Sequence, residues 1–440
     1  MVMYMAPDVY VEEVSGGARP IEAVGTSNAG FLGVAPDPRA HFNEAVDIGN
    51  WTRFVQEFIP EATAESTQLS NAVFAFFQNG GSRCYVVNVG QGQPIAGGGR
   101  ERTGLDLLEP LNVQIVAAPG YTDPASYDAL LSHCERLGDR VAILDAPRDV
   151  AELNRLTEVA TIEGGQPESP SRRGVTPSRG EGDAAAGSSA ETGSDTPPAD
   201  ADSIPGASTT GIGGRGMRGR QSDGGYGAYY FPWIMGRDPL VPNNLVVMPP
   251  SGYMAGIWAR NDGTRGVHKA PANEIIRGAL GVTHLLTRAE LGELNQAGVN
   301  CIRAFPTEGI RVWGARTLAG SSSEWRYLSV RRLFNMVKES IAGGTRWIVF
   351  EPNDYTLWKS IIRDISAFLI GLWRNGALMG RTPEEAFFVK CDAETNPPDV
   401  INRGMVVTIV GLAPVKPAEF VVFRISQWDS GTEIEVRGAA

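Results

Sequence analysis

Two pairs of polar residues have the types that catalysis or metal binding uses. His133 and Cys134 are adjacent and would suggest a metal ligand set or a thiol nucleophile, and His268 with Asp262 would supply the acid–base half of a protease triad. Consecutive residues of a helix point apart, and none of the four histidines is spaced from a cysteine as a zinc site requires. No serine lies in a motif that would complete the His268 pair. We interpret His133 and Cys134 as an ordinary helical pair and predict no catalytic or metal site.

A glycine pattern and a pair of carboxylates are the remaining chemical candidates. Residues 211–216 match the G-x-G-x-x-G phosphate-binding pattern, but that mechanism needs a strand before and a helix after, and the sequence predicts neither. Glu384 and Glu385 follow Thr382 and Pro383 and belong to a helix cap, not to an acid–base pair. We expect no cofactor. A hydrolase on an α/β scaffold is the alternative to a structural protein.

The segment from Glu324 to Asp392 holds the clearest elements. An amphipathic helix that ends at Gly343-Gly344 is predicted by the spacing of five apolar residues, Val330, Leu333, Phe334, Val337 and Ile341. A second helix follows, and the whole segment predicts a compact α/β unit with one core.

Short connections in this segment also carry local signals. Trp347–Phe350 is a short apolar run and is predicted to be a buried strand. Asp354 is placed to cap the second helix, over Leu357–Trp373. Thr382 and Glu385 predict a capping box at the start of a third, short helix.

Strand-like and helical runs alternate over most of the remaining chain. The predicted strands are Ala29–Val34, Cys84–Val89, Val113–Ala117, Val141–Asp145 and Leu245–Met248, and the predicted helices are Leu69–Gln78 and Ser126–Leu137. The order strand, helix, strand from 113 to 145 is typical of a βαβ unit. Residues 164–225 interrupt the pattern with 62 residues that contain four large apolar side chains and no aromatic one, so we expect a flexible insert.

Both ends of the chain contain β-prone runs without a partner of their own. Val9-Tyr10-Val11-Glu12 lies in an N-terminal arm beside Gly16-Gly17, and so short a strand must add to a sheet elsewhere. Phe420–Ile425 has strong strand propensity and lies between runs at 406–411 and 432–436. A sheet near the C-terminus is therefore the expected acceptor. Spacing alone leaves open whether the arm pairs within its own subunit or with a neighbour.

Basic residues fall on one stripe of each predicted C-terminal helix. Lys359, Arg363 and Arg374 share a stripe of the second helix, and Arg331 and Lys338 share a stripe of the first. A stripe of this kind is ordinarily a solvated face. The alternative interpretation is a basic rail that docks on an acidic partner surface.

Composition limits the classes of partner. The formal net charge is −11, and residues 1–163 carry 10 Lys and Arg against 22 Asp and Glu, whereas nucleic-acid binding needs a basic footprint. The four cysteines are far apart, which indicates reduced thiols. No signal peptide is evident and no apolar run approaches the ~20 residues of a membrane span. We expect a soluble protein made in the cytoplasm that does not bind nucleic acid.

Several stretches of the sequence resemble contractile tail sheath proteins, which occur in phage tails and in bacterial contractile injection systems. The stretches are Pro7 with Val9–Glu13, Arg19–Glu22, Thr26-Ser27, Phe76–Val87, Ala270–Glu274, Ile302–Arg316 and Glu324–Asp392. Asp8 stands where the family usually has glycine, which affects a local turn. The resemblance covers nearly all of the chain except residues 164–225.

The resemblance implies a multidomain subunit of the α/β class, α+β in part, with extended terminal β-arms. The implied domains are a strand-exchange arm (1–20), an N-terminal mixed α/β domain (21–110), a subtilisin-like α/β domain without protease function that holds the insert (111–320), and a C-terminal sheath domain with terminal strands (321–440).

The resemblance also implies a function. Subunits of this family polymerise helically around an inner tube and contract to drive it through a target envelope, and baseplate and terminal cap proteins are further partners. The implied strand-exchange residues are Val9, Tyr10, Val11, Glu12, Phe420, Val421, Val422 and Phe423. The implied tube contacts are Lys359, Arg363, Arg374, Arg331 and Lys338. The particle would be assembled in the bacterial cytoplasm as a phage tail or a phage-tail-like particle, which can be released.

Overall fold

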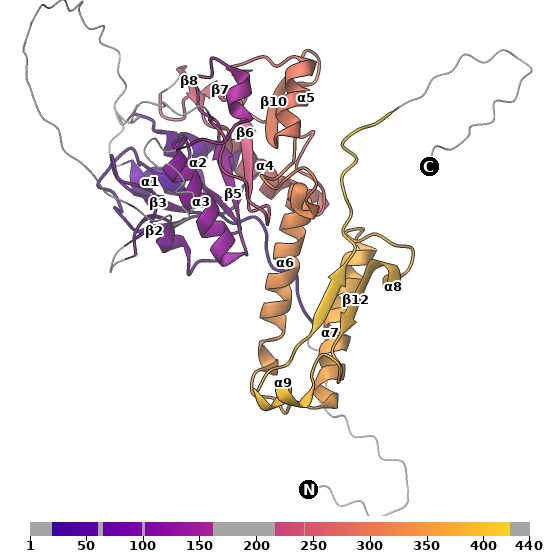
Figure 1. The fold of residues 1–440 in the computed structure, drawn as a ribbon. Coiled ribbons are helices and arrows are strands. Elements are labelled where there is room, and N and C mark those ends of the chain that lie inside the picture. Colours follow the sequence, from indigo (N-terminus) through magenta and orange to yellow (C-terminus); the bar gives the residue numbers. More distant parts are fainter. Residues whose placement is uncertain (1–19, 60–64, 99–101, 162–215, 242, 423–440) are drawn as a thin grey trace, which may run out of the picture. The chain divides into compact units, whose positions relative to one another are not determined.

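The computed structural model describes residues 20–59, 65–98, 102–161, 216–241 and 243–422, which fall into two compact units (Figure 1). The larger unit comprises Ser27–Arg260 and Ala272–Ser323. The smaller unit comprises the described residues up to Thr26, the segment Asn261–Pro271 and the chain from Glu324 onward. Three segments that are far apart in the sequence therefore build the smaller unit.

An eight-stranded sheet forms the centre of the larger unit, in the order β11-β10-β6-β5-β4-β1-β3-β2. The strands are β1 Ala29–Gly33, β2 Ala45–Ile48, β3 Cys84–Asn88, β4 Ile115–Ala117, β5 Val141–Asp145, β6 Gly227–Phe231, β10 Val299–Phe305 and β11 Gly309–Val312. The six inner strands are parallel, and the edge strands β2 and β11 pair antiparallel with their neighbours. Strands β1, β5 and β6 are buried at every position, as expected where a parallel sheet is covered on both faces.

Capping residues fix the ends of helices in this unit. The helices are α1 Trp51–Phe58, α2 Gln68–Gln78, α3 Pro124–Leu137, α4 Pro250–Arg265 and α5 Arg288–Gln296. The Asp123 carboxylate accepts the Ser126 N–H at the start of α3, and Gly138 ends that helix at φ 69°, a conformation that favours glycine. The predicted strands up to Asp145 and both predicted helices are confirmed, with ends that differ by at most two residues.

One prediction about this part of the chain is confirmed and one needs correction. Leu245–Met248 is a strand as predicted, β8, and it pairs with β7 (Ile234–Arg237) in a separate antiparallel sheet completed by β9 (Gly281–Val282). The predicted domain boundary at residue 110 falls inside the eight-stranded sheet, because β1 pairs with β3 on one side and with β4 on the other. Pairing between strands so distant in sequence leaves no local signal.

The predicted flexible insert is shorter than 164–225 at its C-terminal end. Residues 162–215 lie outside the described residues, as does nearly all of the glycine pattern at 211–216. From Gly216 onward the chain is part of the larger unit: Met217 is buried in its core, and Arg220 contacts the carboxylates of Asp128 and Glu135 at 2.6 and 2.8 Å. A single large apolar side chain and three charges thus hold a stretch whose composition alone suggested disorder.

The smaller unit is built on two long helices, α6 (Leu328–Gly344) and α7 (Tyr355–Arg374). Its other elements are α8 Pro383–Ala386, α9 Pro398–Asn402, β12 Phe387–Lys390 and β13 Ile409–Leu412. Both helices contribute apolar residues to one core, which includes Leu333, Val337, Ile361, Ile365 and Leu369. The Asp354 carboxylate accepts the Leu357 N–H at 2.9 Å, so the predicted cap of α7 is confirmed.

Two local predictions for the smaller unit are wrong. Trp347–Phe350 is not a buried strand: residues 346–348 form a short 3-10 helix, and Phe350 is fully exposed with φ 71°. A short apolar run becomes a strand only where another strand can pair with it, and the described residues offer none there. The capping box at Thr382 is also absent, since the Glu385 carboxylate accepts the Arg381 N–H at 2.8 Å instead.

Candidate assembly interface

The sheet formed by β12 and β13 lies on the smaller unit with one face turned to its core. The strands pair antiparallel, with Phe387 opposite Leu412 and Lys390 opposite Ile409. Phe387, Val389, Val410 and Leu412 pack against the core that α6 and α7 share. The alternate residues point the other way, so the second face of the sheet carries Phe388 and Ile409, whose exposed fractions are 57% and 48%.

Each strand of this sheet has a ladder partner on one side only among the described residues. Ala413, which continues β13, donates its N–H to the Ala386 carbonyl at 2.9 Å and accepts the Met379 N–H at 2.8 Å. In an extended strand the N–H and C=O of one residue point to the same edge. The far edges of β12 and β13 therefore present backbone groups that another strand can pair with.

The structure describes three of the eight predicted strand-exchange residues. Phe420, Val421 and Val422 are 73%, 70% and 79% exposed and are not part of a strand. Phe423 and the arm residues Val9, Tyr10, Val11 and Glu12 lie outside the described residues. Three large apolar side chains in sequence thus remain accessible at the end of the described chain.

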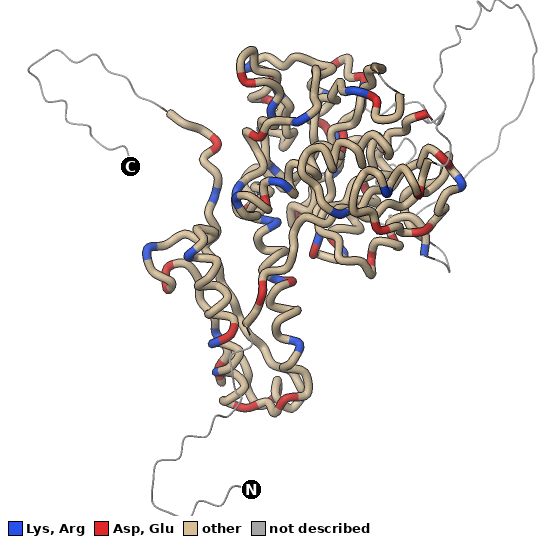
Figure 2. Tube along the Cα trace, turned by 180° about the vertical axis from the view of Figure 1, so that it is seen from behind, with Lys and Arg blue, Asp and Glu red and all other residues tan. Residues whose placement is uncertain are grey.

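Four of the five basic residues predicted to contact an inner tube are exposed: Lys359, Arg363, Arg374 and Lys338. Arg331 is buried, because Trp325 lies 4.0 Å from its guanidinium carbon and its Nε donates to the Asn335 side chain at 2.9 Å. Figure 2 shows basic and acidic residues interspersed along this unit, and Arg363 pairs with the adjacent Asp364 at 3.0 Å. The expected stripe is therefore real on α7 but loses Arg331 on α6.

The residues that suggested chemistry are engaged elsewhere. Burial, with Arg140 nearby, lowers the pKa of His133 to about 4, and burial raises the pKa of the Cys134 thiol, so both are neutral at pH 7. Asp262 does not face His268: both of its oxygens accept hydrogen bonds from Arg332, at 2.9 and 2.6 Å. In the part of the chain that the structure describes, no group of three His, Cys, Asp or Glu side chains could hold a metal ion.

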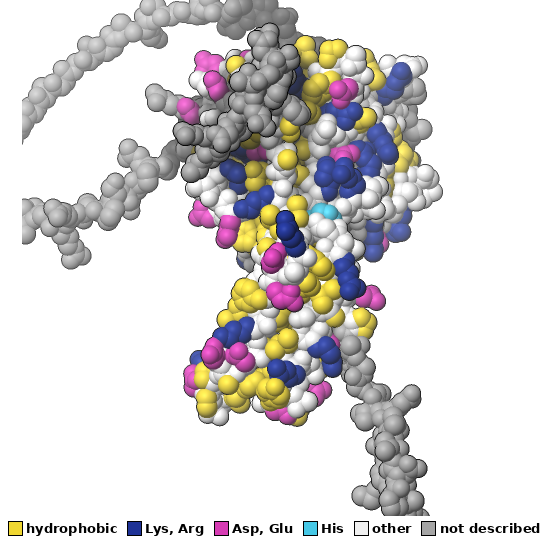
Figure 3. Space-filling model, turned by 90° about the vertical axis from the view of Figure 1, so that its right-hand side faces the viewer, with side chains coloured by type: hydrophobic (Ala, Val, Ile, Leu, Met, Phe, Trp, Pro, Cys, Tyr) yellow, Lys and Arg dark blue, Asp and Glu magenta, His cyan; other side chains and the backbone are white. Residues whose placement is uncertain are grey.

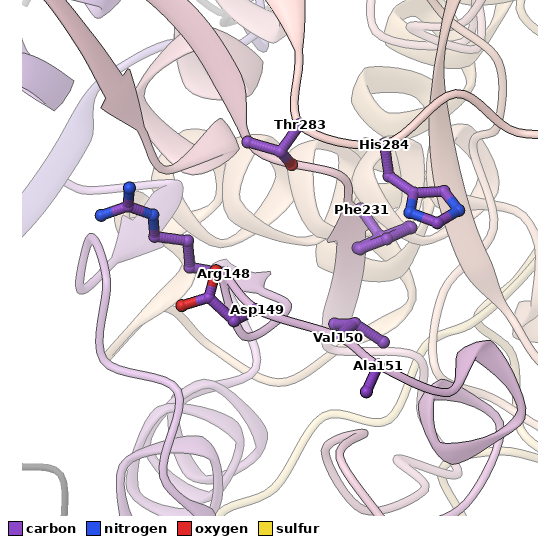
Figure 4. A pocket seen from close by; sticks show the side chains of 7 residues that line it. All are labelled: Arg148, Asp149, Val150, Ala151, Phe231, Thr283 and His284. Carbon is purple, nitrogen blue, oxygen red and sulfur yellow. The ribbon is translucent and has the colours of Figure 1, made fainter.

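A pocket of about 370 Å³ opens beyond the ends of β5 and β6 in the larger unit (Figure 4). Its lining residues are Arg148, Asp149, Val150, Ala151, Phe231, Thr283 and His284. The His284 and Phe231 rings lie 5.8 Å apart, and the Thr283 hydroxyl donates to the Trp233 carbonyl at 3.4 Å. The lining contains no serine or cysteine.

Comparison with known proteins decides the family. Residues 221–318 match the phage tail sheath protein central domain, and residues 321–427 match the phage tail sheath C-terminal domain. The structure is similar over 97% of its length to a subunit of the contracted sheath complex of an extracellular contractile injection system, PVC, with 26% identity, a TM-score of 0.67 and 99% of that chain covered. The chain belongs to the contractile tail sheath family.

Other members of the sheath family give the same result. The contracted helical sheath of the anti-feeding prophage is 27% identical, with a TM-score of 0.65, and the match covers 97% of this chain and all of that one. The tail sheath protein of Vibrio phage KVP40 is 31% identical over 40% of this chain and 26% of its own length. A putative prophage major tail sheath protein of Pseudomonas aeruginosa is 28% identical over 41% of this chain and 46% of its own length. The matches thus span less than half of these two sequence relatives.

No helix among the described residues of this sheath-family chain is both long and apolar enough to span a bilayer. The sequence-predicted α/β class agrees with the mixed structure and with the sheath structures. The unpaired edges of β12 and β13 could not be found from sequence. The nearest signal was the apolar run before Gly411, which placed a strand there but not its neighbours.

Proposed function

We propose that this protein is the structural subunit of a contractile sheath, which polymerises helically around an inner tube and contracts to drive the tube through a target envelope. The observation that carries the proposal is the two-stranded sheet with an open edge on each side, in a chain whose full-length structural neighbours are subunits of contracted sheaths. Baseplate and terminal cap proteins are the further partners we expect.

Strand exchange is the proposed link between subunits. A two-stranded sheet is marginally stable by itself, and adding a strand to each edge pairs its free N–H and C=O groups. In our proposal, Val9–Glu12 of one subunit occupies one edge of a neighbour's β12–β13 sheet, and Phe420–Phe423 of another subunit occupies the other edge. Heterologous contacts of this kind generate a helical filament where the rotation between subunits does not close a ring.

Exposed basic residues on α7 are the proposed contact with the inner tube. Lys359, Arg363 and Arg374, together with Lys338 on α6, are accessible to an acidic tube surface, whereas Arg331 is withdrawn from the hypothesis because it is buried. We assign no catalytic role, because in this mechanism the free energy for contraction is stored during assembly and no nucleotide hydrolysis is needed. The proposed location is the bacterial cytoplasm, where the particle would be assembled as a phage tail or a tail-like particle.

Negative-stain electron microscopy tests the proposal. We would compare the full chain with a variant in which residues 1–14 are replaced by a Gly/Ser segment of equal length, which keeps the chain length but removes the β-prone run. Hollow helical tubes from the full chain and only monomers or short rings from the variant are expected. If both chains remain small and monodisperse, the proposed function is wrong.

A further inference from the structure

The segment that joins the N-terminal arm to the larger unit lies along α6. The Val24 N–H donates to the Ser340 hydroxyl at 3.0 Å, and the Thr26 carbonyl accepts from Arg332 Nη2 at 3.0 Å. Ile21 lies against Gly344, where an added Cβ would come within 2.7 Å of its side chain. As the residue number rises from 21 to 26, the contacted position on α6 falls from 344 to 332, so the segment runs antiparallel to the helix.

The length of an extended chain over residues 21–26 agrees with the length of α6 that these residues contact. An extended chain from Ile21 to Thr26 covers about 17 Å, and an α-helix rises about 18 Å from Arg332 to Gly344. Contacts at the start, the middle and the end of the segment therefore hold it in an extended form along almost three-quarters of α6. We call residues 21–26 the anchor segment.

A buried ion pair holds the C-terminal end of the anchor segment. Arg332 and Asp262 side chains are 3% and 4% exposed, and the guanidinium donates to both carboxylate oxygens. The Thr26 hydroxyl donates to the same carboxylate at 2.5 Å, and Arg332 also donates to the Thr26 carbonyl. One arginine and one aspartate thus connect three chain segments, which are the anchor segment, the end of α4 and the start of α6.

The cluster has the properties of a fixed joint rather than a surface contact. A bidentate Arg–carboxylate pair has a defined geometry, and removing one member of a buried pair leaves an uncompensated charge. Ser340 also donates its hydroxyl to the Met336 carbonyl at 2.7 Å, so the group that receives Val24 is itself held by α6. Each polar contact of the anchor segment therefore ends on a side chain that the helix or the ion pair fixes.

We propose that Arg332 and Asp262 are positioning residues that anchor the N-terminal arm to α6, so that tension on the arm enters the smaller unit along this helix and the arm pivots only before Ile21. The part of the proposal that concerns tension rests on the proposed sheath function, since tension on the arm arises only if the arm joins another subunit. The anchor itself is a property of the single chain.

Hydrogen exchange of the full-length protein, followed by mass spectrometry, tests the anchor. Arg332→Met removes the charge but keeps an apolar stem, and Ser340→Ala removes the hydroxyl that accepts the Val24 N–H and donates to the Met336 carbonyl. Arg403→Met is the matched control, because the Arg403 side chain is 62% exposed and its partner Asp399 is exposed as well. We expect the Val24 amide to exchange about tenfold faster or more in the first two variants and at the original rate in the control.

Two results would overturn the anchor. One is an unchanged Val24 exchange rate in both Arg332→Met and Ser340→Ala. The other is an equal acceleration of amides throughout α6 and α7, which would show that these residues support the whole unit and not the arm. Arg332→Lys retains the charge, and we expect this variant to keep part of the protection that Arg332→Met loses.

The transmission of tension from the arm to α6 is tested on assembled tubes. Tubes formed by Ser340→Ala or Arg332→Met should be shorter than those of the original chain and should break under shear, whereas tubes formed by Arg403→Met should not. Tubes of normal length and strength from both anchor variants would overturn it. If the original chain forms no tubes, the proposed function fails, while the exchange measurement still decides whether the anchor exists.

Discussion

Phe388 lies directly opposite Gly411 in the β12–β13 ladder, and its ring fills the space above the glycine. A Cβ built on Gly411 would come within 2.0 Å of that ring. An aromatic ring over a cross-strand glycine stabilises a strand pair that has few other contacts. The same ring is 57% exposed, on the face of the sheet that points away from the core. Figure 3 shows other apolar side chains at the surface of the smaller unit, interspersed with charged ones.

We expect Gly411→Ala to displace the Phe388 ring and to weaken the sheet. The change should lower the free energy of unfolding by about 1 kcal/mol, because the ring can rotate into solvent and the backbone need not move. Urea unfolding measures the effect. Gly371→Ala is the control, since a Cβ in this last turn of α7 meets nothing within 4 Å and should stabilise the protein slightly. Equal effects of both substitutions would contradict the role of Phe388.

His133 should make the protein sensitive to acid. Its pKa is lowered from 6.5 to about 4 in the folded protein, chiefly by burial, so the unfolded chain takes up a proton at a higher pH than the folded one. Stability is therefore lost as pH falls from 6.5 through 4, by an amount on the order of 2–3 kcal/mol. Urea unfolding at pH 7 and pH 4.5 should show a smaller difference for His133→Gln than for the original chain. An identical difference would show that other groups cause the sensitivity.

Replacing residues 162–215 with a short Gly/Ser linker should leave the larger unit folded. The chain on either side is already joined: Val159 and Arg218 form a β-bridge, and the Ala160 N–H donates to the Arg218 carbonyl at 2.8 Å. Loop-closure entropy changes slowly with length, so we expect a shift of less than about 1 kcal/mol in the free energy of unfolding. Thermal unfolding of the two chains tests this, and loss of the folded state would mean that the insert contributes to the core.

Charge reversal on α7 should weaken assembly around an inner tube without unfolding the subunit. Lys359→Glu with Arg374→Glu changes two exposed side chains, so the melting temperature should move by no more than a few degrees. The fraction of sheaths that contain a tube should fall in electron micrographs of co-expressed proteins. Arg403→Glu, at the exposed residue that follows α9, is the control. Tube-filled sheaths at the original frequency would exclude this contact.

Sequence reasoning located elements well where one short-range signal decided them. Asp123 and Gly138 bound α3, and Asp354 begins α7, because caps act over three or four residues. Sequence reasoning failed where a contact with a residue of another element decides whether a side chain is buried. Arg331 lies on the predicted stripe of α6, but Trp325 covers it. Met217 lies in a low-complexity stretch, but a core formed by remote strands receives it.

The open edges of the β12–β13 sheet show the same limit. The sequence predicts strands near both ends of the chain but not which of them pair within one subunit. The alternative that the arm pairs within its own subunit stays open until pairing between chains is measured.

Cross-linking between two variants that each add one cysteine to the native four tests strand exchange most directly. Tyr10→Cys and Ile409→Cys would be purified separately, mixed, assembled and treated with a short bis-maleimide reagent. The four native cysteines are buried and give little background, and Ala125→Cys replaces Ile409→Cys in the control. We predict cross-linked dimers from the Tyr10 and Ile409 mixture only. Cross-links in a Tyr10→Cys/Ile409→Cys double variant, with none in the mixture, would show that the arm pairs within its own subunit and would contradict strand exchange.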